Sequence, residues 1–194
     1  MAGRFEVLPG GGAAVALDEV EISILRSLAV QLMELIGPGD EPVEGEDPLA
    51  ALFAEGPSEA PSDPALKRLF PDAYGDEDEE LRAAAADFRR YTENDLRARK
   101  RQDALAVIRS LDGLSATGDD AVVLKLTVDE SRAWLGALND LRLTIGTRLE
   151  VTDEDESGDL YRLPDSDPRK PMVMAYLWLG ALQESLVETL MSGE

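Results

Sequence analysis

The sequence predicts a mainly α protein, a helical bundle of about five long helices with a small antiparallel β element. Long segments place apolar residues at helical spacing, which is typical of helices that bury one face. Two short apolar runs flank Pro9-Gly10-Gly11-Gly12, which indicates a hairpin. A length of 194 residues with 44% hydrophobic content suits one globular unit, so we expect residues 1–194 to form a single domain.

The N-terminal elements are bounded by residues that typically start or end helices and turns. Residues 4–17 read as the hairpin, and Asp18 then opens a helix, because its carboxylate can accept hydrogen bonds from the first-turn amides. Apolar residues continue at helical spacing up to Gly37-Pro38, a pair that ends helices.

An acidic excursion follows the first helix. Residues 38–62 are rich in Pro, Gly, Asp and Glu, so we expect a mobile loop there. Residues 47–53 inside it can form a short helix, and Asp63-Pro64 opens another that ends before Pro71. In both segments a proline takes the first helical position, where it is tolerated.

Residues 77–111 have a helical pattern that we expect to be broken once, because Thr92-Glu93-Asn94-Asp95 resembles a capping box. One strand is predicted near 121–126, completing the β element, and a helix from about 130 to 149. A second acidic loop covers residues 152–168. The final helix begins after Asp167-Pro168, and its many leucines would suit a homodimer.

Composition limits the function. Forty Asp and Glu against nineteen Lys and Arg give a net charge of −21, which repels nucleic acid and anionic lipid unless a basic patch overrides it. Cysteine and histidine are absent, which excludes disulfides, thiolate nucleophiles and ordinary zinc sites. The N-terminus lacks a signal-peptide pattern and no apolar run reaches the length of a membrane span, so we expect a cytoplasmic protein without membrane contact.

No residues are identified as catalytic, cofactor-binding or metal-binding. The acidic run 153–159 begins like a calcium-binding loop, but Pro164 stands where the closing bidentate glutamate is needed. A solvated acidic loop is the simpler interpretation. No serine has a histidine to activate it, and no phosphate-binding glycine loop is present.

A basic island stands out within the acidic chain. Residues 81–111 contain eight Arg and Lys and four Asp and Glu, whereas residues 40–80 contain fourteen Asp and Glu and two basic residues. One interpretation is intramolecular, with guanidinium groups neutralising the neighbouring acidic segment. The other is a partner-binding surface, whose candidate residues are Arg89, Arg90, Arg97, Arg99, Lys100 and Arg101.

Polar residues also interrupt the predicted helix 130–149. Asn139, Asp140 and Arg142 break its apolar pattern, so they either form a buried polar tie with another helix or face solvent. Trp134 and Trp178 have apolar neighbours and are expected in the core.

Several segments resemble the actinobacterial family that is catalogued as a domain of unknown function and named for the oxidative-stress regulator AosR. The most specific part is Ala137-Leu138-Asn139-Asp140-Leu141-Arg142 with Gly146-Thr147-Arg148-Leu149, and the other segments are 46–49, 71–74, 87–90, 92–97 and 182–186. The resemblance implies a redox-responsive regulator that acts with an extracytoplasmic-function sigma factor on cysteine-biosynthesis genes. The disulfide switch of such a member cannot operate here, because this sequence has no cysteine.

We therefore expect a non-enzymatic regulatory protein acting through protein–protein contacts. The resemblance implies a transcription-associated oxidative-stress regulator with a sigma factor or RNA polymerase as its partner. The alternative is a direct DNA-binding regulator that uses the basic helix 97–101. A third hypothesis is an enzyme of unrecognised type.

Overall fold

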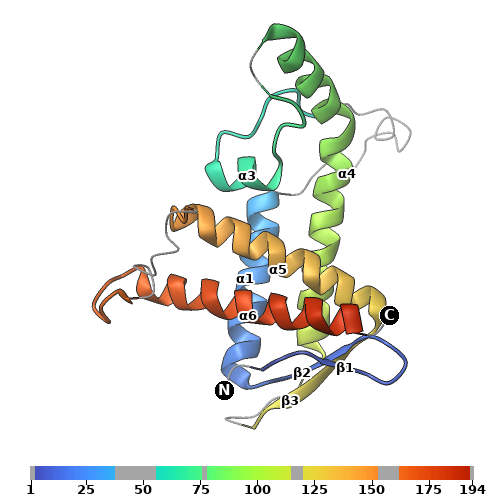
Figure 1. Cartoon of the computed structure of the whole chain (residues 1–194), viewed down its shortest axis with the longest axis vertical. Helices are drawn as coiled ribbons and strands as arrows, with labels where there is room; N and C mark the ends of the chain where they lie inside the picture. The colour runs from blue at the N-terminus through green and yellow to red at the C-terminus, as the bar shows by residue number, and fades with distance from the viewer. Residues whose placement is uncertain (1–2, 38–55, 76–77, 115–119, 153–161, 193–194) are drawn as a thin grey trace, which may run out of the picture.

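Five helices and a three-stranded sheet form the part of the chain that the structure describes, residues 3–37, 56–75, 78–114, 120–152 and 162–192 (Figure 1). The structure is a computed structural model. Its helices are α1 Glu19–Ile36, α3 Pro64–Leu69, α4 Glu79–Asp112, α5 Val128–Arg148 and α6 Lys170–Ser192. Its strands are β1 Glu6–Val7, β2 Ala13–Leu17 and β3 Val122–Leu126. The predicted mainly α class with a small antiparallel sheet is confirmed.

The sheet joins two parts of the chain that are far apart in sequence. Strand β2 lies in the middle and pairs antiparallel with both β1 and β3, and Leu17 faces Val122 across the second pair. The hairpin turn contains Gly10, Gly11 and Gly12, all with positive φ, a conformation that glycine adopts without a side-chain clash. The predicted hairpin and third strand are both present.

Strands β2 and β3 each lead directly into a helix through a capping box. At α1, the Asp18 carboxylate accepts from the Glu21 amide at 2.8 Å, and the Glu21 side chain accepts from the Asp18 amide. At α5, Thr127 and Glu130 make the same reciprocal pair. These boxes satisfy amides that the helix itself leaves without acceptors.

The predicted break inside residues 77–111 is wrong, because α4 is one continuous helix of 34 residues. Thr92 does not cap a new helix, since its hydroxyl donates to the Phe88 carbonyl one turn earlier at 2.7 Å. Glu93 does not reach back to a cap either. Its buried carboxylate pairs with Arg89 and Arg97 on the same helix, which stabilises the turn where we expected the break.

The core is centred on α5. Figure 1 shows α5 and α6 running side by side across α1 and α4. Trp134 of α5 is fully buried, and its ring meets the Phe5 ring edge-on at 5.9 Å between centroids. The leucines of α6 turn towards the same core, which leaves the opposite face of α6 exposed.

Two predicted features lie outside the described residues. They are the short helix at 47–53 and the calcium-like run 153–159. Most of the acidic loop 38–62 also lies there, whereas the predicted helix at Asp63-Pro64 is present as α3, capped by the Asp63 carboxylate.

Candidate protein-binding surfaces

The first of the six candidate residues, Arg89, points into the fold. Its side chain is 4% exposed and donates to the Phe70 carbonyl at 3.0 Å, to Asp72 at 2.8 Å and to Glu93. Burial lowers the pKa of this guanidinium, but its hydrogen bonds to the Asp72 and Glu93 carboxylates outweigh that effect and raise the pKa. Arg89 therefore ties α4 to the chain that follows α3.

Two further island residues close the C-terminal end of α1. Arg97 donates to the Ile36 carbonyl at 2.6 Å, and Arg101 donates to the Gly37 carbonyl. The last carbonyls of a helix have no intrahelical partner and carry a negative partial charge, so cations are favourable there. Arg97 also stacks over the Phe70 ring at 4.3 Å, which adds a cation–π contact.

Lys100 connects α4 to α5. Its Nζ lies 2.6 Å from an Asp140 carboxylate oxygen, and the Asp140 residue is only 2% exposed. Burial raises the pKa of Asp140, and the hydrogen bond from Lys100 acts against it. Asp103, one turn along α4, also has a raised pKa through burial and lies against Gly136, where an added Cβ would be 2.6 Å from its carboxylate.

The remaining two candidate residues lie nearer the surface. Arg99 is exposed, and Arg90 is partly buried, with its guanidinium 3.8 Å from Asp87. Side-chain contacts with other segments of the fold are thus made by Arg89, Arg97, Lys100 and Arg101. Of these, Arg89 alone is seen to pair with a described acid of segment 40–80, Asp72, whereas Arg97 and Lys100 pair with Glu93 and Asp140.

Residues 139–142 form the predicted polar tie between helices. Asp140 reaches α4, as described above, while Arg142 donates to Gln183 of α6 at 2.6 Å and Asn139 accepts from the same Gln183 at 3.4 Å. The Arg142 guanidinium also lies 5.2 Å from the centre of the Tyr176 ring. The tie therefore joins three helices, and the residues that carry it are the ones that broke the apolar pattern.

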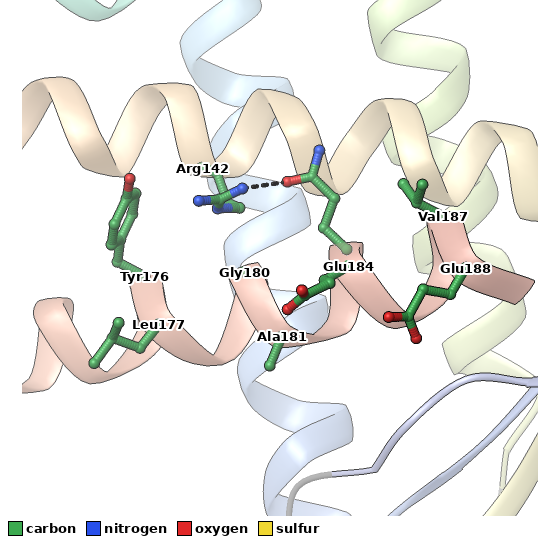
Figure 2. Close-up of a pocket in the computed structure, with 9 residues that line it drawn as sticks. Arg142, Tyr176, Leu177, Gly180, Ala181, Glu184, Val187 and Glu188 are labelled. Atoms are coloured by element: carbon green, nitrogen blue, oxygen red, sulfur yellow. Dashed lines mark hydrogen bonds between the residues drawn. The ribbon is translucent and has the colours of Figure 1, made fainter. Parts of the chain in front are cut away.

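An open groove of about 710 Å³ lies where α5 meets α6. Figure 2 shows Arg142 extending from α5 towards Gly180 of α6, with Tyr176 on one side and Glu184 and Glu188 further along α6. A smaller hollow of about 250 Å³ adjoins it and shares Glu184 and Glu188, with Arg4 on its far side. Together they form a continuous mixed-charge surface along the outer face of α6.

Sequence reasoning missed this surface. Its centre is Gly180-Ala181, two small residues inside an otherwise leucine-rich helix. A small pair at such a position is a sign of close approach by another group, and here that group is Arg142, which would be 3.4 Å from a Cβ added at Gly180.

The described residues give no cluster suited to a metal ion: no three His, Cys, Asp or Glu side chains gather there. Across the same ranges, no helix is long and apolar enough to span a bilayer.

Comparison with known proteins decides the family. Residues 2–190 match the family described as Domain of unknown function (DUF2017). The chain belongs to this family. A relative from Mycobacterium tuberculosis named "Oxidative stress regulator AosR" is 30% identical over 193 residues, covering 97% of this chain and 86% of the relative. The "Putative oxidative stress regulator AosR" of Mycobacterium leprae is 31% identical over 180 residues, covering 89% and 79%.

No solved structure is significantly similar to this DUF2017 chain. The resemblance noted from the sequence is confirmed at family level. The segment identified there as most specific, Ala137 to Arg142, contains the polar tie between α4, α5 and α6.

Proposed function

We propose that this chain is a non-enzymatic regulatory protein of the oxidative-stress response that acts through protein–protein contacts. The observation that carries the proposal is the similarity to proteins named oxidative stress regulator over 97% of this chain. A match of that extent spans nearly the whole chain, so the similarity does not rest on one motif.

Contacts with protein, not DNA, are favoured by electrostatics. The net charge is −21, and Arg97, Lys100 and Arg101 of the basic helix are engaged by Glu93, Asp140 and backbone carbonyls. Binding phosphates through these cations would require breaking contacts that are partly buried. The missing imidazole and thiol groups support a non-enzymatic role, since they remove the commonest bases and nucleophiles.

A thiol switch within this chain is excluded, because it has no cysteine. We propose that the oxidant is sensed by a partner and that this chain sets the activity of the complex. A sigma factor or RNA polymerase is the partner we propose, in line with a regulatory role at transcription.

The test is recovery of partners from the protein's own cells. Tagged protein is purified with and without nuclease, before and after a peroxide challenge, and the recovered proteins are quantified by mass spectrometry. Stoichiometric, nuclease-resistant recovery of a sigma factor or RNA polymerase is the expected result. If recovery disappears on nuclease treatment, the association depends on nucleic acid, and the result would favour the nucleic-acid-binding alternative.

A binding measurement on pure protein distinguishes the proposal from the alternative of direct DNA binding. We expect no shift in the fluorescence anisotropy of labelled duplex DNA at roughly physiological salt, where phosphate contacts are already weakened. Arg99→Ala serves as the probe, since Arg99 is exposed and its loss leaves the buried pairs intact. DNA binding that survives this salt and drops in Arg99→Ala would contradict the proposal.

A further inference from the structure

The leucines of α6, which from the sequence would suit a homodimer, do not lie on its outer face. Leu179, Leu182 and Leu186 are fully buried against α5 and the rest of the core, so they are not available to a second molecule. The opposite face carries a row spaced three or four residues apart, which one helical face presents together. Its members, all exposed except the partly buried Leu177, are Met174, Leu177, Ala181, Glu184, Glu188 and Met191.

Charge on this face is balanced, unlike that of the chain as a whole. Among the residues lining the groove and the adjoining hollow, Arg142 and Arg4 are cations and Glu184 and Glu188 are carboxylates. Their sum is zero in a chain of net charge −21. A second equally acidic molecule therefore meets less repulsion at this face than the overall charge would impose.

Two charged side chains on this face remain available for an ion pair with another molecule. Arg142 is partly buried and donates to Gln183, and it is in none of the ion pairs formed among the described residues. Glu184 is exposed and is in none of the ion pairs formed among the described residues. Arg142 lies at the level of Gly180 and Tyr176, and Glu184 lies one helical turn further along α6.

We infer that this face binds a second copy of the chain, with the two α6 helices antiparallel and crossing at Gly180-Ala181. A two-fold axis there places Glu184, about 5 Å beyond the crossing at 1.5 Å of rise per residue, beside Arg142 of the partner subunit. The same contact then forms twice. The small side chains at the crossing let the helices approach closely, and Met174 and Leu177 supply apolar area.

The absence of cysteine makes the arrangement directly testable by disulfide trapping, since any introduced thiol is the sole thiol of its chain. Residue 181 meets its own copy at the crossing, so Ala181→Cys should cross-link under mild oxidation, a reaction that needs Cα atoms within about 7 Å. Met191→Cys is the matched control on the same helix. Its Cα atoms lie about 30 Å apart in an antiparallel pair, so it should stay monomeric on a denaturing gel.

The pattern of cross-linking distinguishes the alternatives. A parallel pair would also cross-link Met191→Cys, which would overturn the antiparallel arrangement. Random collision would cross-link Val123→Cys on β3, which is 54% exposed and far from α6 in sequence, as readily as Ala181→Cys. That result, or no cross-link at residue 181, would overturn the proposal.

Charge reversal tests the recognition itself, using sedimentation of the purified whole chain to obtain the dimer Kd. Glu184→Arg should weaken dimerisation at least tenfold, and Glu184→Arg combined with Arg142→Glu should restore it, because the pair is re-formed with reversed signs. Unchanged sedimentation of Glu184→Arg, or a wild-type chain that stays monomeric at high micromolar concentration, contradicts the proposal. The proposed regulatory function does not depend on either result.

Discussion

Asp103 and Asp140 occupy the crossing of α4 and α5, where burial outweighs the nearby cations. Burial raises the pKa of Asp103, opposed by Arg99 and Lys100 and reinforced by Asp140. Burial also raises the pKa of Asp140, opposed by its bond to Lys100. Both carboxyls thus hold protons more readily in the folded chain than in the unfolded one. Their contribution to stability is complete below the unfolded pKa and is lost as the pH rises through the folded pKa.

The sign of this pH dependence can be tested with two variants whose stability relative to wild type should change in opposite directions. Asp103→Asn removes a carboxyl of raised pKa, so this variant should gain stability relative to wild type as the pH rises above about 4. Asp63 has a lowered pKa, mainly through its hydrogen bond from Arg148, so Asp63→Asn should lose relative stability as the pH rises towards about 4 and change little above it. Urea unfolding of the three proteins between pH 3 and about 7 measures both slopes. Slopes of the same sign would contradict the assignment.

Glu93 illustrates a buried charge that depends on its partners. It is 3% exposed and lies between Arg89 and Arg97, the first of which is itself buried. Glu93→Ala leaves the guanidinium groups with fewer acceptors, and breaking one member of such a cluster costs about 3–5 kcal/mol of unfolding free energy. Asp87→Ala on the same helix is the control, because its side chain is 66% exposed. Equal losses in both variants would show that the cluster contributes little.

The sequence indicated some of these residues but not their partners. Asn139, Asp140 and Arg142 were identified as a polar tie because they interrupt an apolar helical face. Lys100, the partner of Asp140, was assigned to the basic island instead, since forty positions separate the two residues in the chain. Charge counted along a sequence does not show which cations turn inward, because that depends on how α4 crosses α1 and α5.

At the level of elements, prediction succeeded where the signal is local. Asp18 and Asp63 cap their helices as the sequence suggested, because a cap needs only the residues of its own first turn. The break expected at Thr92 failed for the converse reason. Glu93 matches a capping pattern, but its buried pairing with Arg89 and Arg97 keeps α4 continuous, as described above.

The β1–β2 turn allows a comparison of two glycines. Gly10 and Gly12 both have positive φ, but only an added Cβ at Gly12 would run into a backbone atom, the Leu126 carbonyl oxygen, while Gly10 has open space. Gly12→Ala should therefore lose more unfolding free energy than Gly10→Ala, which carries only the strain of its φ, of order 1–3 kcal/mol. Thermal unfolding of both variants measures the difference. Equal losses would mean that the turn adjusts away from β3.

At the scale of the whole molecule, the inward pairing of cations changes the field outside. Arg89, Arg97, Lys100 and Arg101 are held against carboxylates or helix carbonyls. The basic island thus presents less positive charge to solvent than its sequence indicates, and the excess of acids dominates the surface field. A field of one sign repels the chain from itself and lowers the stability of the compact state.

Salt should therefore stabilise this protein. Raising ionic strength from about 0.01 M to 1 M shortens the screening length from about 30 Å to about 3 Å, which removes long-range repulsion before it weakens contacts at hydrogen-bond distance. Exposed pairs such as Arg148 with Asp63 lose strength as well, but each contributes only about 0–1 kcal/mol. For every 1 kcal/mol of repulsion relieved, Tm should rise by about 2–4 °C in a chain of this size. Scans in sodium chloride at a fixed low protein concentration measure the effect. A Tm that falls with salt would show that local ion pairs, and not the net charge of −21, control the electrostatic part of the stability.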